Sequence, residues 1–243
     1  MKILITEFME VKSVEILKTN FDVTFDQDLS TNSNELKKII SNFDALIVRN
    51  KTQVNKEVLE NAPNLKFVGR LGVGLDNIDI EYCKSNNIHV QPATGMNADS
   101  VAEYVINTSL SLLKNIPLMH RETSIGNWPR TSISSQELKG KTIGLLGFGL
   151  IAKKVSVLAK VFNASIIAYD PFVDPSIGNE FDVKLIDINE IFKLADIITI
   201  HLPLSESTKN LLNYEAFKKM KKQPIIINSS RGSIINEEDL LRA

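Results

Sequence analysis

The chain has 243 residues, a formal net charge of −1 and 43% hydrophobic residues, the balance of an ordinary globular protein with one or two domains. This balance gives no electrostatic basis for binding nucleic acid or an anionic membrane surface, and no apolar run approaches the length of a membrane span. The single cysteine, Cys83, excludes an internal disulfide and fits a reducing cytoplasm, and its place on an apolar helical face predicts a packing role.

The first hundred residues alternate between short apolar runs and amphipathic segments. The chain starts directly in such a run, which we expect to be a strand and not a signal peptide. Strands are predicted at residues 2–6, 21–25, 44–48, 65–69 and 88–90. Helices are predicted at residues 10–19, 34–40, 56–61 and 76–85, the first with Val11, Val14, Ile16 and Leu17 facing inward. Strands separated by helices of this length predict a parallel sheet covered on both faces.

Three loops follow strands at the edge where open α/β sheets bind ligands. They are 49–52, 70–76 and 91–97, and the second is rich in glycine and runs into a helix, so its amides can bind an anion. Each loop alone is equally compatible with a simple turn. Three loops on one edge, two of them with an arginine, favour a small anionic substrate.

A long helix is predicted from Ala98 to about Ile116, with Val101, Val105, Thr108, Leu112 and Leu113 on its apolar face. We expect it to leave the first domain and enter the second. The segment 120–139 is polar and irregular and contains the single tryptophan, Trp128. This tryptophan is either a packing plug or a subunit contact, and we favour the contact.

The segment from Thr142 to Asp170 carries the most specific local pattern. An apolar run at 143–146 precedes Gly147 and Gly149, and a second run at 165–169 ends on Asp170. Between them lies an apolar helical stripe formed by Ile151, Val155, Leu158, Ala159 and Phe162. This order of strand, glycine turn, helix, strand and acid is typical of a dinucleotide-binding unit.

Each residue type in this unit has a physical reason. Gly147 permits the tight turn, and Gly149 lets the backbone approach a pyrophosphate at the helix N-terminus. Ala152 stands at the third glycine position, where close packing of helix on strand needs only a small residue. A carboxylate at Asp170 can accept hydrogen bonds from the ribose hydroxyls and repels a 2′-phosphate, so the pattern predicts NAD and not NADP.

The alternation resumes after Asp170. Helices are predicted at 187–194 and 213–220, strands at 196–200 and 224–228, and a further helix from Asn236. Asn213 is a predicted N-cap, and the lysines at 218–222 fit a solvated helix end.

Further motifs, in order along the chain, carry a resemblance to a known family. They are VRNKTQVN (48–55), GRLGVGLDNID (69–79), ATGMNADSVAE (93–103), HLPLSESTKNLLN (201–213) and NSSRGSIINEEDLLRA (228–243). Together with the glycine turn they resemble the D-isomer-specific 2-hydroxyacid dehydrogenases, most of all their phosphoglycerate dehydrogenase-like members. The resemblance implies an α/β fold of two doubly wound parallel-sheet domains: a flavodoxin-like substrate domain at 1–97 and a Rossmann NAD-binding domain at 98–243. It also implies a cytoplasmic homodimer that forms through the cofactor domain and an arm at 117–139.

The resemblance assigns roles to individual residues. The residues implied for NAD are Gly147, Gly149, Leu150, Ile151, Asp170, His201, Leu202, Pro203, Thr208, Ser229 and Ser230. The amides of Val73 and Gly74 are implied for the carboxylate of a small anionic 2-hydroxy or 2-oxo acid, and the rest of the substrate is assigned to Arg49, Asn50 and Asn97. Arg231 is the implied catalytic arginine, whose planar fork can clamp that carboxylate and polarise the C2 carbonyl. A salt bridge at a strand end is the alternative for Arg231, and no metal site is implied.

The family's chemistry also needs a histidine and an orienting glutamate, both well downstream of the arginine. Only residues 232–243 follow Arg231, and His89, His120 and His201 do not obviously substitute. We therefore expect that the 243-residue form is truncated at its C-terminus, with an unfinished cofactor domain, and is inactive as given.

Two alternatives stay open beside an NAD-dependent 2-hydroxyacid dehydrogenase. One is a non-catalytic, NAD(H)-sensing interaction protein, although a pure sensor needs neither Arg231 nor the first-domain carboxylate loop. The other is a related reductase of sulfolactate or glyoxylate/hydroxypyruvate type, because Arg49 and Arg70 can serve a distal phosphate or sulfonate equally well.

Overall fold

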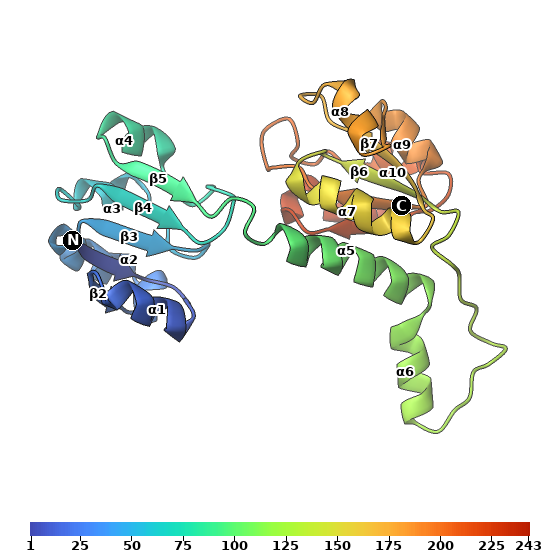
Figure 1. Ribbon diagram of the computed structural model, residues 1–243, viewed down its shortest axis with the longest axis horizontal. Coiled ribbons are helices and arrows are strands. Elements are labelled where there is room, and N and C mark those ends of the chain that lie inside the picture. Colours follow the sequence, from blue (N-terminus) through green and yellow to red (C-terminus); the bar gives the residue numbers. More distant parts are fainter. The chain divides into compact units, whose positions relative to one another are not determined.

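The structure, a computed structural model, describes residues 1–243, and the chain divides into two compact units, Met1–Met96 and Asn97–Ala243 (Figure 1). Each unit is an α/β sandwich with its own parallel sheet. No helix in either unit is long and apolar enough to cross a bilayer.

The first unit has five parallel strands in the order β2-β1-β3-β4-β5, which is the flavodoxin-like order. The strands are β1 (Lys2–Ile5), β2 (Asp22–Phe25), β3 (Ala45–Val48), β4 (Phe67–Arg70) and β5 (His89–Pro92). The helices are α1 (Val11–Lys18), α2 (Ser33–Ile39), α3 (Lys56–Glu60) and α4 (Ile80–Ser85), with short 3-10 turns at Gln27–Ser30 and Ile40–Asn42.

Side chains that alternate along the strands separate two cores on the two faces of this sheet. Ile3 and Ile5 pack with Val14 of α1 on one face, whereas Leu4 packs on the other with residues of α2, α3 and α4. Cys83 is fully buried in the second core, as its predicted packing role requires. The prediction that Val11 and Ile16 face inward is wrong. Both are exposed, because Ile16 is about 200° around the helix from buried Val14 and Val11 lies in the first turn.

The second unit has five parallel strands in the order β10-β9-β6-β7-β8, with β6 (Thr142–Leu146), β7 (Ser165–Tyr169), β8 (Lys184–Leu185), β9 (Ile197–Ile200) and β10 (Ile225–Asn228). Counted from β6 this is the order 3-2-1-4-5 of the Rossmann fold. The helices are α5 (Ala98–Leu113), α6 (Ile116–Ser124), α7 (Leu150–Val161), α8 (Pro175–Glu180), α9 (Ile188–Leu194), α10 (Tyr214–Lys219) and α11 (Glu237–Arg242), and a 3-10 turn lies at Gly232–Ile234.

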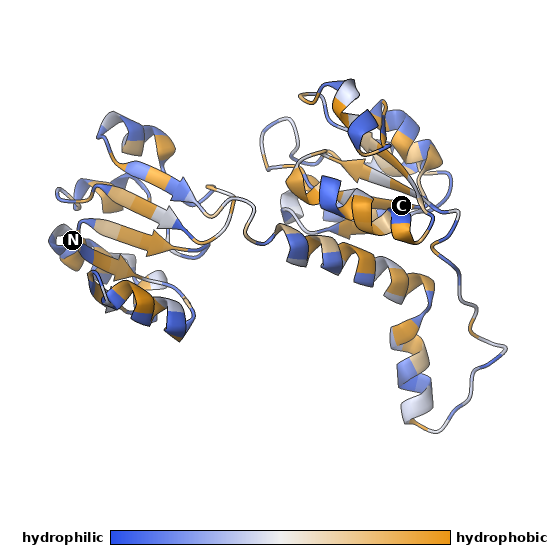
Figure 2. Ribbon diagram, in the orientation of Figure 1, coloured by the Kyte–Doolittle hydropathy of each residue, from blue (hydrophilic) through white to orange (hydrophobic).

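Helices α5 and α7 lie side by side in one core, and α9 and α10 pack in the other (Figure 1). Hydrophobic segments, coloured orange, alternate with polar ones along α5 and α7 in Figure 2. The predicted face of α5 needs correction. Leu112 is exposed, and the buried positions are Ala98, Ala102, Val105, Ile106, Ser109 and Leu113.

The long helix also ends earlier than predicted. Asn115 adopts a left-handed φ of 53°, and α6 then begins with Pro117 in its first turn. The segment from His120 is therefore helical up to Ser124, where the sequence predicts an irregular chain. No residue of α6 is buried, so the helix and the loop after it form an arm (Figure 1).

Candidate cofactor and substrate sites

The glycine turn after β6 has the geometry that its sequence predicts. Gly147 has a φ of +90°, and a Cβ at this position would lie 2.9 Å from the backbone oxygen of His201, so only glycine fits. Gly149 is the N-cap residue of α7 and has open space where a Cβ would stand. The turn therefore brings bare backbone to the surface at the start of a helix.

The first turn of α7 follows directly. The amides of Leu150 and Ile151 belong to the first helical positions, which have no acceptor within the helix, and they can meet an anion there. Ala152 is fully buried in the core shared with α5, which is the close packing expected at the third glycine position.

Asp170 lies beside the glycine turn, at the end of β7. Its carboxylate accepts hydrogen bonds from the backbone N–H of Phe148 at 2.8 Å and of Phe172 at 3.0 Å. Two oxygens offer about four acceptor sites, so acceptor capacity remains for ribose hydroxyls.

His201 follows β9 and is mostly buried. The hydroxyl of Thr199 lies 3.1 Å from Nε2, whereas Nδ1 is buried without a hydrogen-bond partner. Burial lowers the pKa of His201 to about 4, so this imidazole is neutral at physiological pH. The hydroxyl of Thr208, in the same loop, donates to the carbonyl of Pro203 at 2.6 Å and accepts from the N–H of Ser205 at 2.8 Å. Thr208 therefore fixes the loop that presents Leu202 and Pro203.

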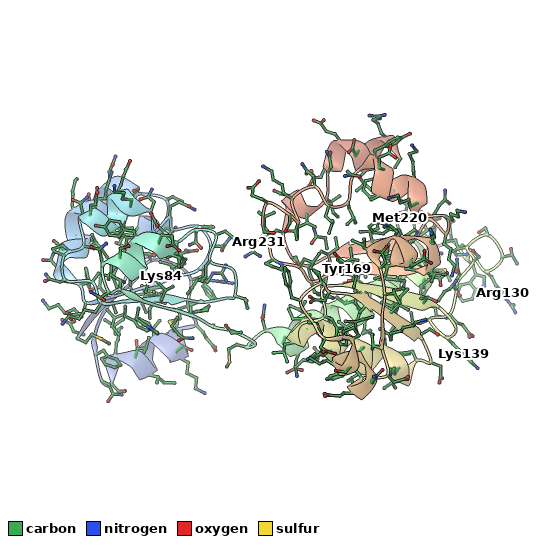
Figure 3. All side chains as sticks on the ribbon, turned by 90° about the horizontal axis from the view of Figure 1, so that it is seen from above. Lys84, Arg130, Lys139, Tyr169, Met220 and Arg231 are labelled. Atoms are coloured by element: carbon green, nitrogen blue, oxygen red, sulfur yellow. The ribbon has the colours of Figure 1, made fainter.

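The segment after β10 carries the serines and the candidate catalytic arginine. Ser230 donates from its hydroxyl to the carbonyl of Ile200 at 2.9 Å, which joins this segment to β9, and the hydroxyl of Ser229 is buried without a partner. The guanidinium of Arg231 (Figure 3) donates to the carbonyl of Ser230 at 3.1 Å. Arg231 lines a hollow of about 510 Å³ together with Gly232, Ile235, Glu237, Leu240 and Leu241.

All these cofactor candidates lie at one edge of the second sheet. Strands β7, β6, β9 and β10 are parallel neighbours, so the segments that follow them emerge together. The chain reverses its winding between β6 and β9, and dinucleotides bind at such a switch point.

The substrate candidates of the first unit share the equivalent edge of the first sheet. Val48, Arg70 and Pro92, the last residues of β3, β4 and β5, are register partners, so the loops after them start side by side. Val73 is exposed, and the amides of Val73 and Gly74 are not used in any backbone hydrogen bond. Asn97, by contrast, belongs to the second unit, where it precedes α5 without a side-chain capping bond.

Glu7 is a residue of this edge that the sequence reasoning missed. Glu7 is only 5% exposed, and its carboxylate accepts hydrogen bonds from the backbone N–H groups of Arg49, Asn50, Lys51 and Thr52. Burial alone raises the pKa of Glu7, but these hydrogen bonds outweigh it and leave the pKa below its ordinary value. The position of an acid at the end of the first strand is the only sequence signal for this role.

Comparison with known proteins decides the family. The family model described as D-isomer specific 2-hydroxyacid dehydrogenase, NAD binding domain, matches residues 106–243. The chain belongs to the D-isomer specific 2-hydroxyacid dehydrogenase family. It is 39% identical to the (S)-sulfolactate dehydrogenase of Chromohalobacter salexigens over 98% of this chain and 77% of that protein. It is 38% identical to the D-3-phosphoglycerate dehydrogenase of Methanocaldococcus jannaschii, of which it spans 46%.

Solved structures of this family have the same fold. The D-lactate dehydrogenase of Aquifex aeolicus, complexed with NAD and lactic acid, is similar over all of this chain and 73% of that one, with a TM-score of 0.88 and 26% identity. The sheet edge described above fits NAD as the dehydrogenase cofactor. It combines the glycine turn, a helix N-terminus and Asp170 with two buried polar atoms that lack partners, Nδ1 of His201 and Oγ of Ser229.

Proposed function

We propose that this protein is an NAD-dependent oxidoreductase that interconverts a D-2-hydroxy acid and the corresponding 2-oxo acid. The observation that carries the proposal is the placement of Arg231 directly after the serines of β10, on the same sheet edge as the glycine turn and Asp170. The bound cofactor supplies or accepts the hydride at C2 of the substrate.

The chain's own residues bind and orient the acid in this proposal. The guanidinium of Arg231 holds the substrate carboxylate with its planar fork and polarises the C2 carbonyl. The amides of Val73 and Gly74, which make no hydrogen bond to another backbone group, offer further donors for the carboxylate. The rest of the substrate binds to Arg49, Asn50 and Asn97.

We propose a substrate with a second anionic group. Arg49 begins the loop after β3 and is exposed at the sheet edge, and Arg70 is the last residue of β4. The two relatives named above act, by their names, on acids with a sulfonate or a phosphate. A three-carbon acid with either group satisfies the arginines, because both groups present several oxygen acceptors.

We further propose that the polypeptide of residues 1–243 alone binds NAD poorly and turns over negligibly. A proton must reach or leave the C2 oxygen, and a histidine normally carries it. His201 is buried with a pKa of about 4, His89 stacks on Phe67 in the first unit with ring centroids 5.5 Å apart, and His120 lies on α6. None of these three is a suitable donor.

The proposal includes a cytoplasmic homodimer that associates through the cofactor domain and the arm at 117–139. Its support is the set of exposed apolar side chains on α6 and the loop after it, which are Ile116, Leu118, Ile125 and Trp128. The single, buried Cys83 fits a reducing compartment.

Oxidation of NADH with a panel of 2-oxo acids tests the proposed reaction. The panel contains phosphohydroxypyruvate, sulfopyruvate, hydroxypyruvate and glyoxylate, and the protein is assayed with its complete reading frame beside residues 1–243. We expect one of the doubly anionic acids to be preferred and Arg231→Lys to lower kcat/KM by about 100-fold or more, because lysine cannot form the bidentate fork. An active protein that is insensitive to Arg231→Lys contradicts the role of the arginine. NADH binding without any turnover of the complete protein favours the sensing alternative.

A further inference from the structure

Hydrogen bonds from two sides hold the loop formed by residues 49–52. No sequence motif predicts this arrangement. On one side lies the buried carboxylate of Glu7. The backbone N–H groups of the loop donate to it at 2.8 Å (Arg49), 3.2 Å (Asn50), 3.1 Å (Lys51) and 2.9 Å (Thr52). A buried carboxylate is tolerated only when hydrogen bonds replace its lost hydration, and here four consecutive amides do so.

On the other side lies the buried side chain of Asn77. Its amide nitrogen donates to the carbonyl of Thr52 at 2.7 Å and to that of Arg49 at 3.3 Å. The hydroxyls of Thr52 and Thr6 lie 2.8 Å apart and complete the network. Thus the first and last residues of the loop are fixed through both their N–H groups and their carbonyls.

Asn77 also joins this loop to the second substrate loop. It stands at the end of the segment that contains Val73 and Gly74, and its carbonyl accepts from the N–H of Val54 at 2.8 Å. The network therefore spans three segments that follow β1, β3 and β4.

The network leaves only side chains of the first loop for a ligand. The amides of the loop are all directed at Glu7, so they cannot bind an external anion. The Arg49 side chain instead extends beside Phe8, with its guanidinium carbon 5.9 Å from the ring centroid. Both residues line a hollow of about 200 Å³ with Glu7, Gln27, Ser30, Asn50 and Lys51.

We propose that Glu7 and Asn77 are positioning residues that fix this loop and thereby aim the Arg49 side chain at the distal anionic group of the substrate. The inference rests on the proposed function, because it takes Arg49 as a substrate contact. It adds that recognition of the distal anion depends on a carboxylate that acts through the backbone of the loop.

Equilibrium binding of two acids that differ by one group tests this inference. The probes are D-3-phosphoglycerate and D-glycerate, measured with the protein in its complete reading frame at saturating NAD, with sulfolactate as a third probe for the sulfonate. The variants are Glu7→Gln, which removes the charge, and Glu7→Asp, which keeps it. A third variant, Asn77→Asp, replaces the amide donor with a carboxylate that repels the carbonyls of Arg49 and Thr52. Glu10→Gln is the matched control, since Glu10 is exposed three residues away and makes no side-chain capping bond.

We expect Glu7→Gln to weaken binding of 3-phosphoglycerate by about tenfold and binding of glycerate by less than about twofold, and the amides of residues 49–52 to exchange faster with solvent. Asn77→Asp is expected to have the same selective effect, and Glu7→Asp to retain most of the affinity. If the variants lose affinity for sulfolactate as they do for 3-phosphoglycerate, the site recognises both sulfonate and phosphate groups.

Three results would overturn the inference. The first is unchanged affinity for 3-phosphoglycerate in Glu7→Gln while the four amides exchange faster. The second is an equal loss for both acids, which indicates a purely structural role. The third is an Arg49→Gln variant that binds 3-phosphoglycerate normally. This last result removes Arg49 from the substrate site but leaves the oxidoreductase proposal, which the NADH assay tests separately.

Discussion

At the residue scale, the two glycines of the nucleotide turn are required for different reasons. Gly147 is fixed by conformation and by the nearby backbone of His201, whereas Gly149 has an ordinary φ of −81° and open space around it. The first is therefore needed by the fold, and the second only by a ligand that approaches the backbone.

A pair of alanine substitutions separates these reasons. Gly147→Ala is expected to lower the free energy of unfolding by about 1–3 kcal/mol, because it forces a side chain into a left-handed conformation against a carbonyl. Gly149→Ala is expected to leave stability within about 0.5 kcal/mol but to weaken NADH binding. Urea unfolding and NADH fluorescence titrations measure the two effects. Equal destabilisation by both variants would refute the distinction.

The burial of His201 predicts a dependence of stability on pH. Its pKa is about 4 in the folded chain against 6.5 for an ordinary histidine, so between these values the unfolded chain binds the extra proton. The free energy of unfolding is therefore highest, as far as His201 is concerned, above pH 6.5. It falls by up to ~3 kcal/mol as the pH drops toward 4. Urea unfolding at several pH values should show a shallower acid dependence for His201→Gln than for the wild type. Parallel curves would contradict the burial of a neutral imidazole.

At the element scale, helices α5 and α7 pack through small side chains. Ala102 of α5 and Ala152 and Ala159 of α7 are fully buried in one core, and an exposed ion pair between Asp99 and Lys154 also joins the helices. The close packing, and not the ion pair, should provide most of the stability at this contact, because exposed ion pairs contribute little.

Two substitutions in α5 test this ranking. Ala102→Leu is expected to destabilise the protein by about 1–3 kcal/mol through overpacking, and Asp99→Asn by less than about 1 kcal/mol. Thermal and urea unfolding provide the comparison. A larger effect of Asp99→Asn than of Ala102→Leu would reverse the ranking.

The elements that the sequence predicts well are those that carry either a short apolar run or an apolar helical face. All strands except β8, together with helix α7, show such a pattern and lie within a few residues of their predicted positions, whereas no strand is predicted at Lys184–Leu185. Helix α6 was missed because its second half, residues 120–124, is polar and carries no apolar stripe. Helix α8 was missed because Pro175 and Gly178 fall within its six residues.

The part of the candidate site that the sequence could not predict depends on contacts between segments distant in sequence. Gly147, Asp170 and Arg231 could be predicted because each lies in a recognisable local motif. Glu7 meets its partners 42 to 45 residues away, and a single acid at a strand end carries no pattern that would identify them. Only the register of β1 with β3 brings the two segments together.

At the scale of the whole molecule, the arm exposes apolar side chains that remain in contact with water in a single chain. Trp128 is 81% exposed in the loop that follows α6. The proposed homodimer would remove this aromatic surface from water.

Light scattering after size exclusion measures this association. We expect about twice the chain mass of 27.1 kDa for the wild type and a shift toward the monomer for Trp128→Ala, because a buried aromatic anchor is worth about 2 kcal/mol or more. Phe172→Ala, which removes a 94% exposed aromatic outside the arm, serves as the control. A wild-type monomer, or a dimer that is unaffected by Trp128→Ala, would contradict the role of the arm.

Transfer of one deuterium atom from the cofactor to the substrate tests the proposed oxidoreductase function. The protein with its complete reading frame is incubated with NADH deuterated at the transferable position of C4 and with the preferred 2-oxo acid, and the product is examined by NMR and by chiral separation. We expect one deuterium at C2 and a product of D configuration. A product without deuterium at C2, a product of L configuration, or no reduction of any 2-oxo acid would contradict it.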